Sequence, residues 1–166
     1  MIAAPVILAS TPSLGVAEGR CRAGETGPAV IVTAVGLKDQ RGRLKVEVYP
    51  AKEADFLADD NILLSAGKTF RRVEVDLSAR PPAELCVRLP GPGRYSMAVT
   101  HDRNGDHKFQ PVSDGVGFPG DPKIGWSTPR AAAAEFVAGP GLIHLYVTIN
   151  YWSGLAAMAP LKREPR

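Results

Sequence analysis

The stretch LKVEVY at residues 44–49 decides the fold class, because its aliphatic side chains alternate with lysine, glutamate and tyrosine. A period of two is typical of a β-strand with one buried and one solvated face. The stretch AVIVTAV at residues 29–35 lies before it and is rich in β-branched side chains, and KDQRG at residues 38–42 has the composition of a turn. We therefore predict a β-hairpin with one wet face.

Similar short runs recur along the rest of the chain. They are FRRVEVDL at residues 70–77, ELCVRL at 84–89, YSMAVT at 95–100, EFV at 135–137 and LIHLYVTINY at 142–151. Proline and glycine punctuate the chain between several of them, and the four alanines at residues 131–134 leave room for no more than a short helical turn. The pattern predicts an all-β fold: a single antiparallel β-sandwich of the immunoglobulin or transthyretin-like type, with about seven strands and one long loop.

Length and composition agree with one ordinary folded domain. The chain has 166 residues, of which 45% are hydrophobic and 22% are charged, and single domains usually run to about 100–200 residues. Its apolar runs all fall short of the roughly 20 residues needed to cross a bilayer, so we expect no transmembrane segment. The net charge of +3 comes without a basic stripe interleaved with aromatic residues, which argues against nucleic acid as a partner.

We expect both ends of the chain to lie outside the folded domain. Residues 1–20 are interpreted either as a truncated export signal or as a disordered leader. Residues 2–8 are apolar and LGVA at 14–17 resembles a cleavage site, but no cationic residue precedes Arg20. We expect the β-sandwich domain to cover residues 21–153, followed by a loose C-terminal tail at residues 154–166.

The two cysteines, Cys21 and Cys86, form no C-x-x-C motif and no zinc-binding spacing. If the protein is exported, they can form one disulfide that ties the N-terminal segment to the strand at residues 84–89. Closing a loop of that length would stabilise the fold by about 4 kcal/mol in the chain-entropy model. The alternative is two separate thiols, one of them a small core residue.

The segment HDRNGDHKFQ at residues 101–110 carries the strongest chemical signal. Oxygen ligands at alternate positions resemble the first half of a calcium loop. The candidate ligands are Asp102, Asn104, Asp106 and the Lys108 carbonyl, with Gln110 and Asp114 as weaker additions. An EF-hand is rejected, because glycine stands at the fourth loop position and Ser113 replaces the bidentate glutamate. The predicted cofactor is a calcium ion that stiffens a β-loop; the alternative is an Asx-rich turn without an ion.

Aromatic residues after this segment suggest a second kind of site. Phe118 and Trp126, together with Tyr95, are candidates for a ligand platform on loops at one end of the sandwich, and His101 would add a polar lining. In the alternative interpretation, Trp126 plugs the open end of the sandwich and covers the core.

Three blocks of sequence resemble a known family. They are GRYSMAVTHDRNGD at residues 93–106, GVGFP at 115–119 and GWS at 125–127. They are similar to the bacterial DUF2141 family of small exported proteins, and the likeness covers roughly residues 29–152. The resemblance implies an exported β-sandwich of unassigned function and carries no catalytic assignment. The chain differs from the family pattern in lacking a glycine after Asp106 and in having Asp121 in place of a glutamate.

These observations predict a non-catalytic module exported to the periplasm or cell envelope, with a binding or structural role and an unknown protein or small-molecule partner. One alternative is a small-ligand or carbohydrate-binding module that uses the loop end near Trp126. Another is a hydrolase that uses His101 and Asp102, but these neighbours on a strand point to opposite faces. The chain also shows neither a G-x-S-x-G motif nor the setting of a nucleophilic cysteine. We therefore expect no enzymatic activity.

Overall fold

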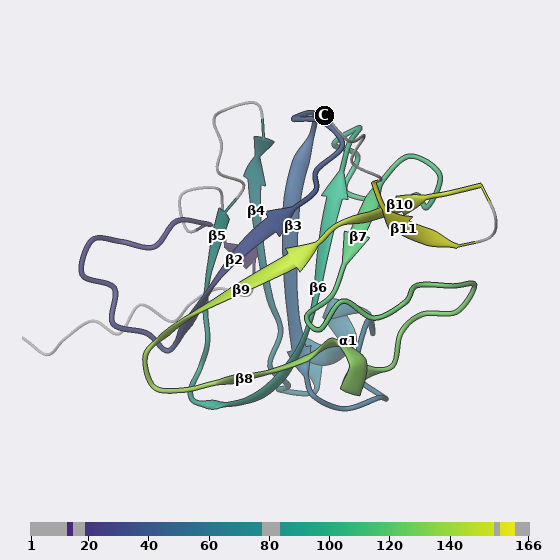
Figure 1. Ribbon diagram of the computed structural model, residues 1–166. Coiled ribbons are helices and arrows are strands. Elements are labelled where there is room, and N and C mark those ends of the chain that lie inside the picture. The colour runs from purple at the N-terminus through teal and green to yellow at the C-terminus, as the bar shows by residue number, and fades with distance from the viewer. Residues whose placement is uncertain (1–12, 15–18, 78–83, 155–156, 162–166) are drawn as a thin grey trace, which may run out of the picture.

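The computed structural model describes residues 13–14, 19–77, 84–154 and 157–161, and these form two β-sheets packed face to face (Figure 1). The all-β sandwich predicted from the alternating runs is thereby confirmed. Most of the expected leader (residues 1–12 and 15–18) and the last five residues lie outside the described residues.

The small sheet has the order β5-β2-β9, and the large sheet has the order β1-β4-β3-β6-β7-β10-β11, with β8 paired to β6. The small sheet contains β2 (Ala29–Val35), β5 (Glu84–Arg88) and β9 (Leu142–Thr148). The large sheet contains β1 (Ser13–Leu14), β3 (Arg43–Pro50), β4 (Arg71–Asp76), β6 (Gly93–Asp102), β7 (Gly115–Gly117), β8 (Glu135–Ala138), β10 (Asn150–Trp152) and β11 (Met158–Pro160). The helical elements are α1 (Asp60–Ser65) and a 3-10 turn at Ala131–Ala134.

Two strand pairs of the described residues are parallel, although the sequence predicted an antiparallel sandwich. β2 runs parallel to β9, from Ala29 opposite Leu142 to Val35 opposite Thr148. β1 runs parallel to β4. The first of these pairs joins segments more than a hundred positions apart, and local alternation does not indicate which distant strand becomes a neighbour.

The main core lies between the sheets and follows the predicted alternation. Val46 on β3 and Val99 on β6 are completely buried there, and Tyr95 shares their face, as expected from the pattern of residues 95–100. The side chains at intervening positions of β3 and β6 point to the outer face of the large sheet. A second apolar cluster covers part of that outer face and includes Leu63 from α1.

The chain leaves the small sheet at Ile149 and enters the large one, so the single strand predicted at residues 142–151 is two strands, β9 and β10. The Ile149 N–H still donates to the Val35 carbonyl, whereas Asn150 pairs with Val116 of β7. The Asn150 side-chain amide donates to the carbonyls of Val116 and Thr148 and so holds this crossing in place. A strand that changes sheets keeps its alternation, which is why the sequence did not reveal the break.

The C-terminal segment contains a strand where the sequence predicted a loose tail. Met158–Pro160 forms β11 and pairs antiparallel with β10, with Met158 opposite Trp152. Met158 is buried in the outer cluster, and its burial accounts for the order of this short segment.

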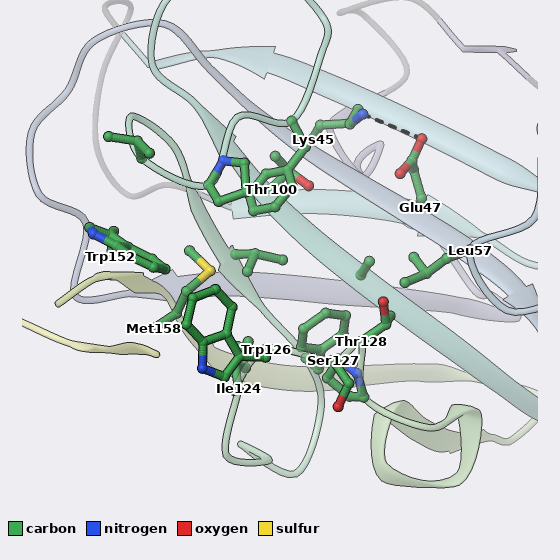
Figure 2. A pocket seen from close by; sticks show the side chains of 18 residues that line it. Lys45, Glu47, Leu57, Thr100, Ile124, Trp126, Ser127, Thr128, Trp152 and Met158 are labelled. Carbon is green, nitrogen blue, oxygen red and sulfur yellow. Dashed lines mark ion pairs between the residues drawn. The ribbon is translucent and has the colours of Figure 1, made fainter. Parts of the chain in front are cut away.

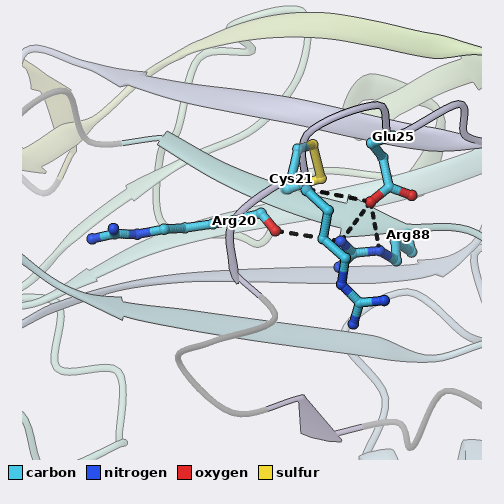
Figure 3. Close-up of a disulfide and its surroundings, with 6 residues drawn as sticks. Arg20, Cys21, Glu25 and Arg88 are labelled. Atoms are coloured by element: carbon cyan, nitrogen blue, oxygen red, sulfur yellow. Dashed lines mark hydrogen bonds and ion pairs between the residues drawn. A yellow bond between two sulfur atoms is a disulfide. The ribbon is translucent and has the colours of Figure 1, made fainter.

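Cys21 and Cys86 form a disulfide, which settles the alternatives left open by the sequence (Figure 3). It ties the segment before β2 to β5. Beside it, Arg88 donates to the Glu25 carboxylate at 2.6 and 3.1 Å and to the Arg20 carbonyl at 3.3 Å. The Arg88 guanidinium holds the pKa of Glu25 below its usual range, chiefly through this hydrogen bonding.

No helix among the described residues has the length and apolar character needed to span a membrane.

Candidate functional site

A groove of about 540 Å³ opens on the outer face of the large sheet (Figure 2). The strands β3 and β6 contribute Lys45, Glu47, Ala98 and Thr100, which all occupy positions that alternate with the buried core residues, and β7 contributes Val116. The strand alternation that fills the core thus also supplies this face of the groove.

Loops and the C-terminal hairpin build the remaining lining. It comes from residues 57 and 118, from residues 109–112, from residues 124–129 and from β10 and β11, and it is mostly apolar. The loop and hairpin residues are Leu57, Phe109, Pro111, Val112, Phe118, Ile124, Gly125, Trp126, Ser127, Thr128, Pro129, Trp152 and Met158. Segments that are far apart in the chain therefore meet here.

The two tryptophans of the chain both line the groove. Trp126 is 84% exposed and Trp152 is 38% exposed, and their rings meet edge to face with centroids 6.2 Å apart. Figure 2 shows them side by side next to Met158. The prediction of Trp126 as a lining residue agrees with this geometry, whereas the alternative in which it plugs the sandwich is wrong, because a plug would be buried.

Exposed apolar side chains concentrate at this groove. Among the described residues, eleven large hydrophobic side chains are exposed, and five of them line it: Leu57, Phe109, Val112, Trp126 and Trp152. Scattered exposed hydrophobic residues are normal on a protein surface, but a contiguous group around a hollow marks a binding site.

The polar end of the groove is formed by an ion-pair cluster. Glu47 accepts from Arg72 at 2.7 Å and from the Tyr49 hydroxyl at 3.1 Å, while the Lys45 ammonium lies 3.5 Å from the same carboxylate. Burial raises the pKa of Tyr49, so its hydroxyl remains a proton donor. Arg72 and Tyr49 engage Glu47 more closely than Lys45 does, which leaves the Lys45 ammonium with N–H donors to offer to a ligand.

The other predicted lining residues lie elsewhere or deeper. Phe118 does line the groove, but it is 3% exposed and packs against Phe56. Tyr95 packs on Phe136 in the main core and is absent from the groove. His101 is completely buried and points into the sandwich, so its prediction as a ligand-binding residue is wrong.

His101 belongs to a buried hydrogen-bond chain. Its Nδ1 lies 2.6 Å from the Tyr151 hydroxyl and its Nε2 lies 2.9 Å from the Arg41 carbonyl. Since the Arg41 carbonyl can only accept, Nε2 carries the proton of the neutral imidazole, and Nδ1 accepts from the Tyr151 hydroxyl. The same hydroxyl accepts from the Lys38 N–H at 2.9 Å. Burial lowers the pKa of His101 below its ordinary value and raises that of Tyr151 to about 12.

The predicted calcium loop runs from Asp102 to Asp114, and its carboxylates accept hydrogen bonds from the loop itself. Asp102 accepts from the N–H groups of Gly105 and His107, both at 2.8 Å. Asp114 accepts from the N–H groups of Arg103 at 3.2 Å and Gln110 at 2.8 Å. Both carboxylates are buried, so these bonds supply the polar partners that their burial requires.

The exposed half of the loop shows the same pattern. Asp106 accepts from the Lys108 N–H at 2.9 Å, from the Asn104 amide at 3.0 Å and from the Gln110 amide at 2.5 Å. The Lys108 N–H, together with Asn104 and Gln110, holds the pKa of Asp106 below its usual range. The Asn104 side-chain oxygen accepts from the Asp106 N–H at 3.2 Å.

This geometry favours the Asx-rich turn over the ion site. Within the described residues, which include the whole loop, no group of three or more His, Cys, Asp or Glu side chains is placed to hold a metal ion. The oxygen atoms of Asp102, Asn104, Asp106 and Asp114 therefore accept backbone or side-chain N–H groups, and Gln110 donates to Asp106 and Asp114. Calcium binding stays a prediction for direct test.

Several groove residues escaped the sequence analysis. The sequence predicts Lys45 and Glu47 on the wet face of a strand, Trp152 at the edge of the domain and Met158 in the tail, whereas the structure brings all four into the groove. The alternation of residues 44–49 did indicate that Lys45 and Glu47 share a face. Nothing in the order of residues indicated that Trp152 would meet Trp126.

A family comparison identifies the chain. The model of DUF2141, described as an uncharacterized protein conserved in bacteria, matches residues 32–143. The chain belongs to this family. The match spans β2 to the start of β9 and includes the loop 103–114 and Trp126. Comparisons with curated proteins and with solved structures returned no match.

Proposed function

We propose that this DUF2141 protein is a non-catalytic binding module whose outer groove takes a small amphipathic ligand. The observation that carries the proposal is the edge-to-face contact of the exposed Trp126 and Trp152 in the lining of a mostly apolar groove. The apolar part of the ligand would lie against the two indole rings, and a polar or anionic group would meet Lys45 and Thr100. Pockets of this size and composition are typical of small-molecule sites.

The chemistry of the lining supports binding rather than catalysis. Lys45 and Glu47 are the ionisable side chains that line the groove among the described residues. Glu47 accepts hydrogen bonds from Arg72 and Tyr49. His101 and Asp102, the predicted hydrolase pair, are buried and hydrogen-bonded to other groups. A hydrolase needs a nucleophile, a base and an orienting group around one accessible point.

The disulfide supports a location outside the cytoplasm. Such bonds persist in oxidising compartments such as the periplasm and are rare in the bacterial cytosol. The Cys21–Cys86 bond is therefore the structural feature behind our proposal that the protein is exported to the periplasm or cell envelope.

Tryptophan fluorescence tests the binding proposal directly, because both tryptophans of the chain line the groove. We expect dodecanoate, added below its micelle concentration, to change the emission in a saturable way. Calorimetry should show that Trp126→Ala weakens this binding at least tenfold. It should also show that Lys45→Met weakens the binding of dodecanoate more than the binding of the uncharged dodecanol.

Val137→Ala is the matched control, because Val137 is 64% exposed and lies outside the groove. This variant should bind dodecanoate like the wild type. If a soluble hexasaccharide saturates the signal and dodecanoate does not, the carbohydrate alternative is correct and the amphipathic ligand is rejected. If neither probe changes the emission, the groove is not a site for these ligands and the proposal fails.

A further inference from the structure

The outer edge of β9 ends the small sheet without a neighbouring strand among the described residues. Two of its side chains, Leu142 and Tyr146, are 38% and 69% exposed. Figure 1 shows β9 as the front strand of the sandwich, next to β2. This edge is separate from the tryptophan groove, because none of residues 142–148 lines that groove.

The direction of the backbone groups on β9 follows from its bonds to β2. In a parallel ladder, alternate residues turn both their N–H and C=O groups toward the same neighbour. The Gly141 carbonyl accepts from the Ala29 N–H at 3.4 Å, and the Ile149 N–H donates to the Val35 carbonyl at 2.9 Å. Odd-numbered residues of β9 therefore face β2, and even-numbered residues face outward: Leu142, His144, Tyr146 and Thr148.

One end of this edge is covered by Asp121, and no strand of the described residues pairs with the rest of it. Asp121 accepts from the Thr148 N–H at 3.1 Å and from its hydroxyl at 3.2 Å, so Thr148 already has its partner. The sequence LIHLYVT contains no proline, lysine or arginine, which commonly protect edge strands from pairing. Leu142, His144 and Tyr146 therefore present outward backbone donors and acceptors at the natural spacing of a strand.

We propose that this edge pairs with β9 of a second copy of this chain, antiparallel and about a two-fold axis at His144. Outward residues must oppose outward residues to exchange hydrogen bonds, and the capped Thr148 takes no part. The register that uses the three open residues places Leu142 opposite Tyr146 of the second copy and His144 opposite His144. Two three-stranded sheets would then join into one.

The identity of the occupant follows from the self-complementarity of this edge. A two-fold interface uses the same surface on both partners, and β9 offers a symmetric row of donors and acceptors centred on one residue. Residues 142–148 carry no Asp, Glu, Lys or Arg, so two copies meet without opposed like charges from these side chains. Leu142 would also face Tyr146, an aliphatic–aromatic cross-strand pair of the kind that stabilises sheets.

Cysteine cross-linking tests both the pairing and its register. In His144→Cys the two engineered residues would have Cα atoms about 5.5 Å apart, within the disulfide range of about 4.4–6.8 Å. We expect this full-length variant to form a covalent dimer under mild oxidation, with a 144–144 link and an intact Cys21–Cys86 bond by mass spectrometry.

Tyr146→Cys is the matched control. In the proposed register residue 146 lies four positions from its counterpart, roughly 13 Å along the strand, although its side chain is exposed. It should cross-link at least tenfold more slowly than His144→Cys. Equal cross-linking of the two variants would overturn the proposed register, and no cross-linking of either would overturn the pairing.

A measurement without engineered thiols completes the test. We expect sedimentation equilibrium of the wild-type chain to show a monomer–dimer equilibrium, and His144→Pro, which removes an outward N–H, to be monomeric. If this variant does not fold, His144→Lys tests the same axis through repulsion of two exposed charges. A wild type that is monomeric at every concentration overturns the proposal.

Discussion

At the scale of single residues, the burial of His101 gives it a structural role. The sequence placed it beside Asp102 as a polar lining residue, but its strand position turns it into the sandwich, where Tyr151 and the Arg41 carbonyl satisfy both ring nitrogens. Burial favours the neutral imidazole, against the opposing effect of Asp39, whose carboxylate lies 3.8 Å from Nε2. The residue stabilises the fold only while it is uncharged.

This burial predicts a pH dependence of stability. The folded-state pKa of His101 lies below the ordinary histidine value of 6.5, so the unfolded chain binds the proton more readily. The stabilisation is complete above about pH 6.5 and is lost as the pH falls below that value, with a slope of at most about 1.4 kcal/mol per pH unit. Urea unfolding between pH 8 and pH 5 measures this slope.

His101→Gln provides the comparison, since glutamine does not titrate. Its free energy of unfolding should vary less steeply with pH between 6.5 and 5 than that of the wild type. Glu25 and Asp39, with pKa values below 4.5 and 3.8, remain charged over most of this window. Identical slopes for the two proteins would show that His101 is not responsible.

At the scale of elements, the loop at residues 103–114 shows how one residue pattern serves two structures. Oxygen atoms at alternate positions suit a hard cation, and they suit the N–H groups of a tight turn equally well. The backbone path decides between them. Here, His107 adopts a φ of 65°, and its N–H is directed at Asp102.

Calcium addition separates these two structures. Because Asp102, Asp106 and Asp114 already accept N–H groups, we expect neither millimolar calcium nor EDTA to move the thermal midpoint of the wild type. Calorimetry of the wild type and of Asp106→Ala measures this. A calcium-dependent rise in the wild type that Asp106→Ala lacks would instead establish the calcium-stabilised loop.

The short strands β7 and β11 belong to the same scale. β7 contains two glycines, and its sequence does not predict a strand. A Cβ atom at Gly117 would lie 2.4 Å from the Thr148 carbonyl oxygen. Glycine is needed there because the chain that crosses from β9 to β10 passes so closely. Such short strands form because adjacent strands pair with them, and local β-propensity does not predict them.

At the scale of the whole molecule, the disulfide connects the start of the described domain to the small sheet. It joins Cys21 to Cys86 across a separation of 65 residues. Constraining the unfolded chain over such a loop is the main source of its stabilisation in the chain-entropy model.

Removal of the disulfide gives a global prediction. Cys21→Ser combined with Cys86→Ser should lower the free energy of unfolding by about 4 kcal/mol, as measured by urea denaturation. Reduction of the wild type should lower the midpoint similarly and leave the double variant unchanged. If the double variant proves as stable as the oxidised wild type, the bond contributes no net stability.

The sequence by itself determined the longer strands and their faces, because a period of two is a local property: residues 44–49 and 95–100 predicted which side chains enter the core. It also indicated the family and the loop with its six polar residues. The tertiary structure alone decided that Lys45, Trp126 and Trp152 share a groove and that β9 lies beside β2 at an open edge. These relations join residues far apart in the chain, and they depend on how the sheets pack and where strands change sheets.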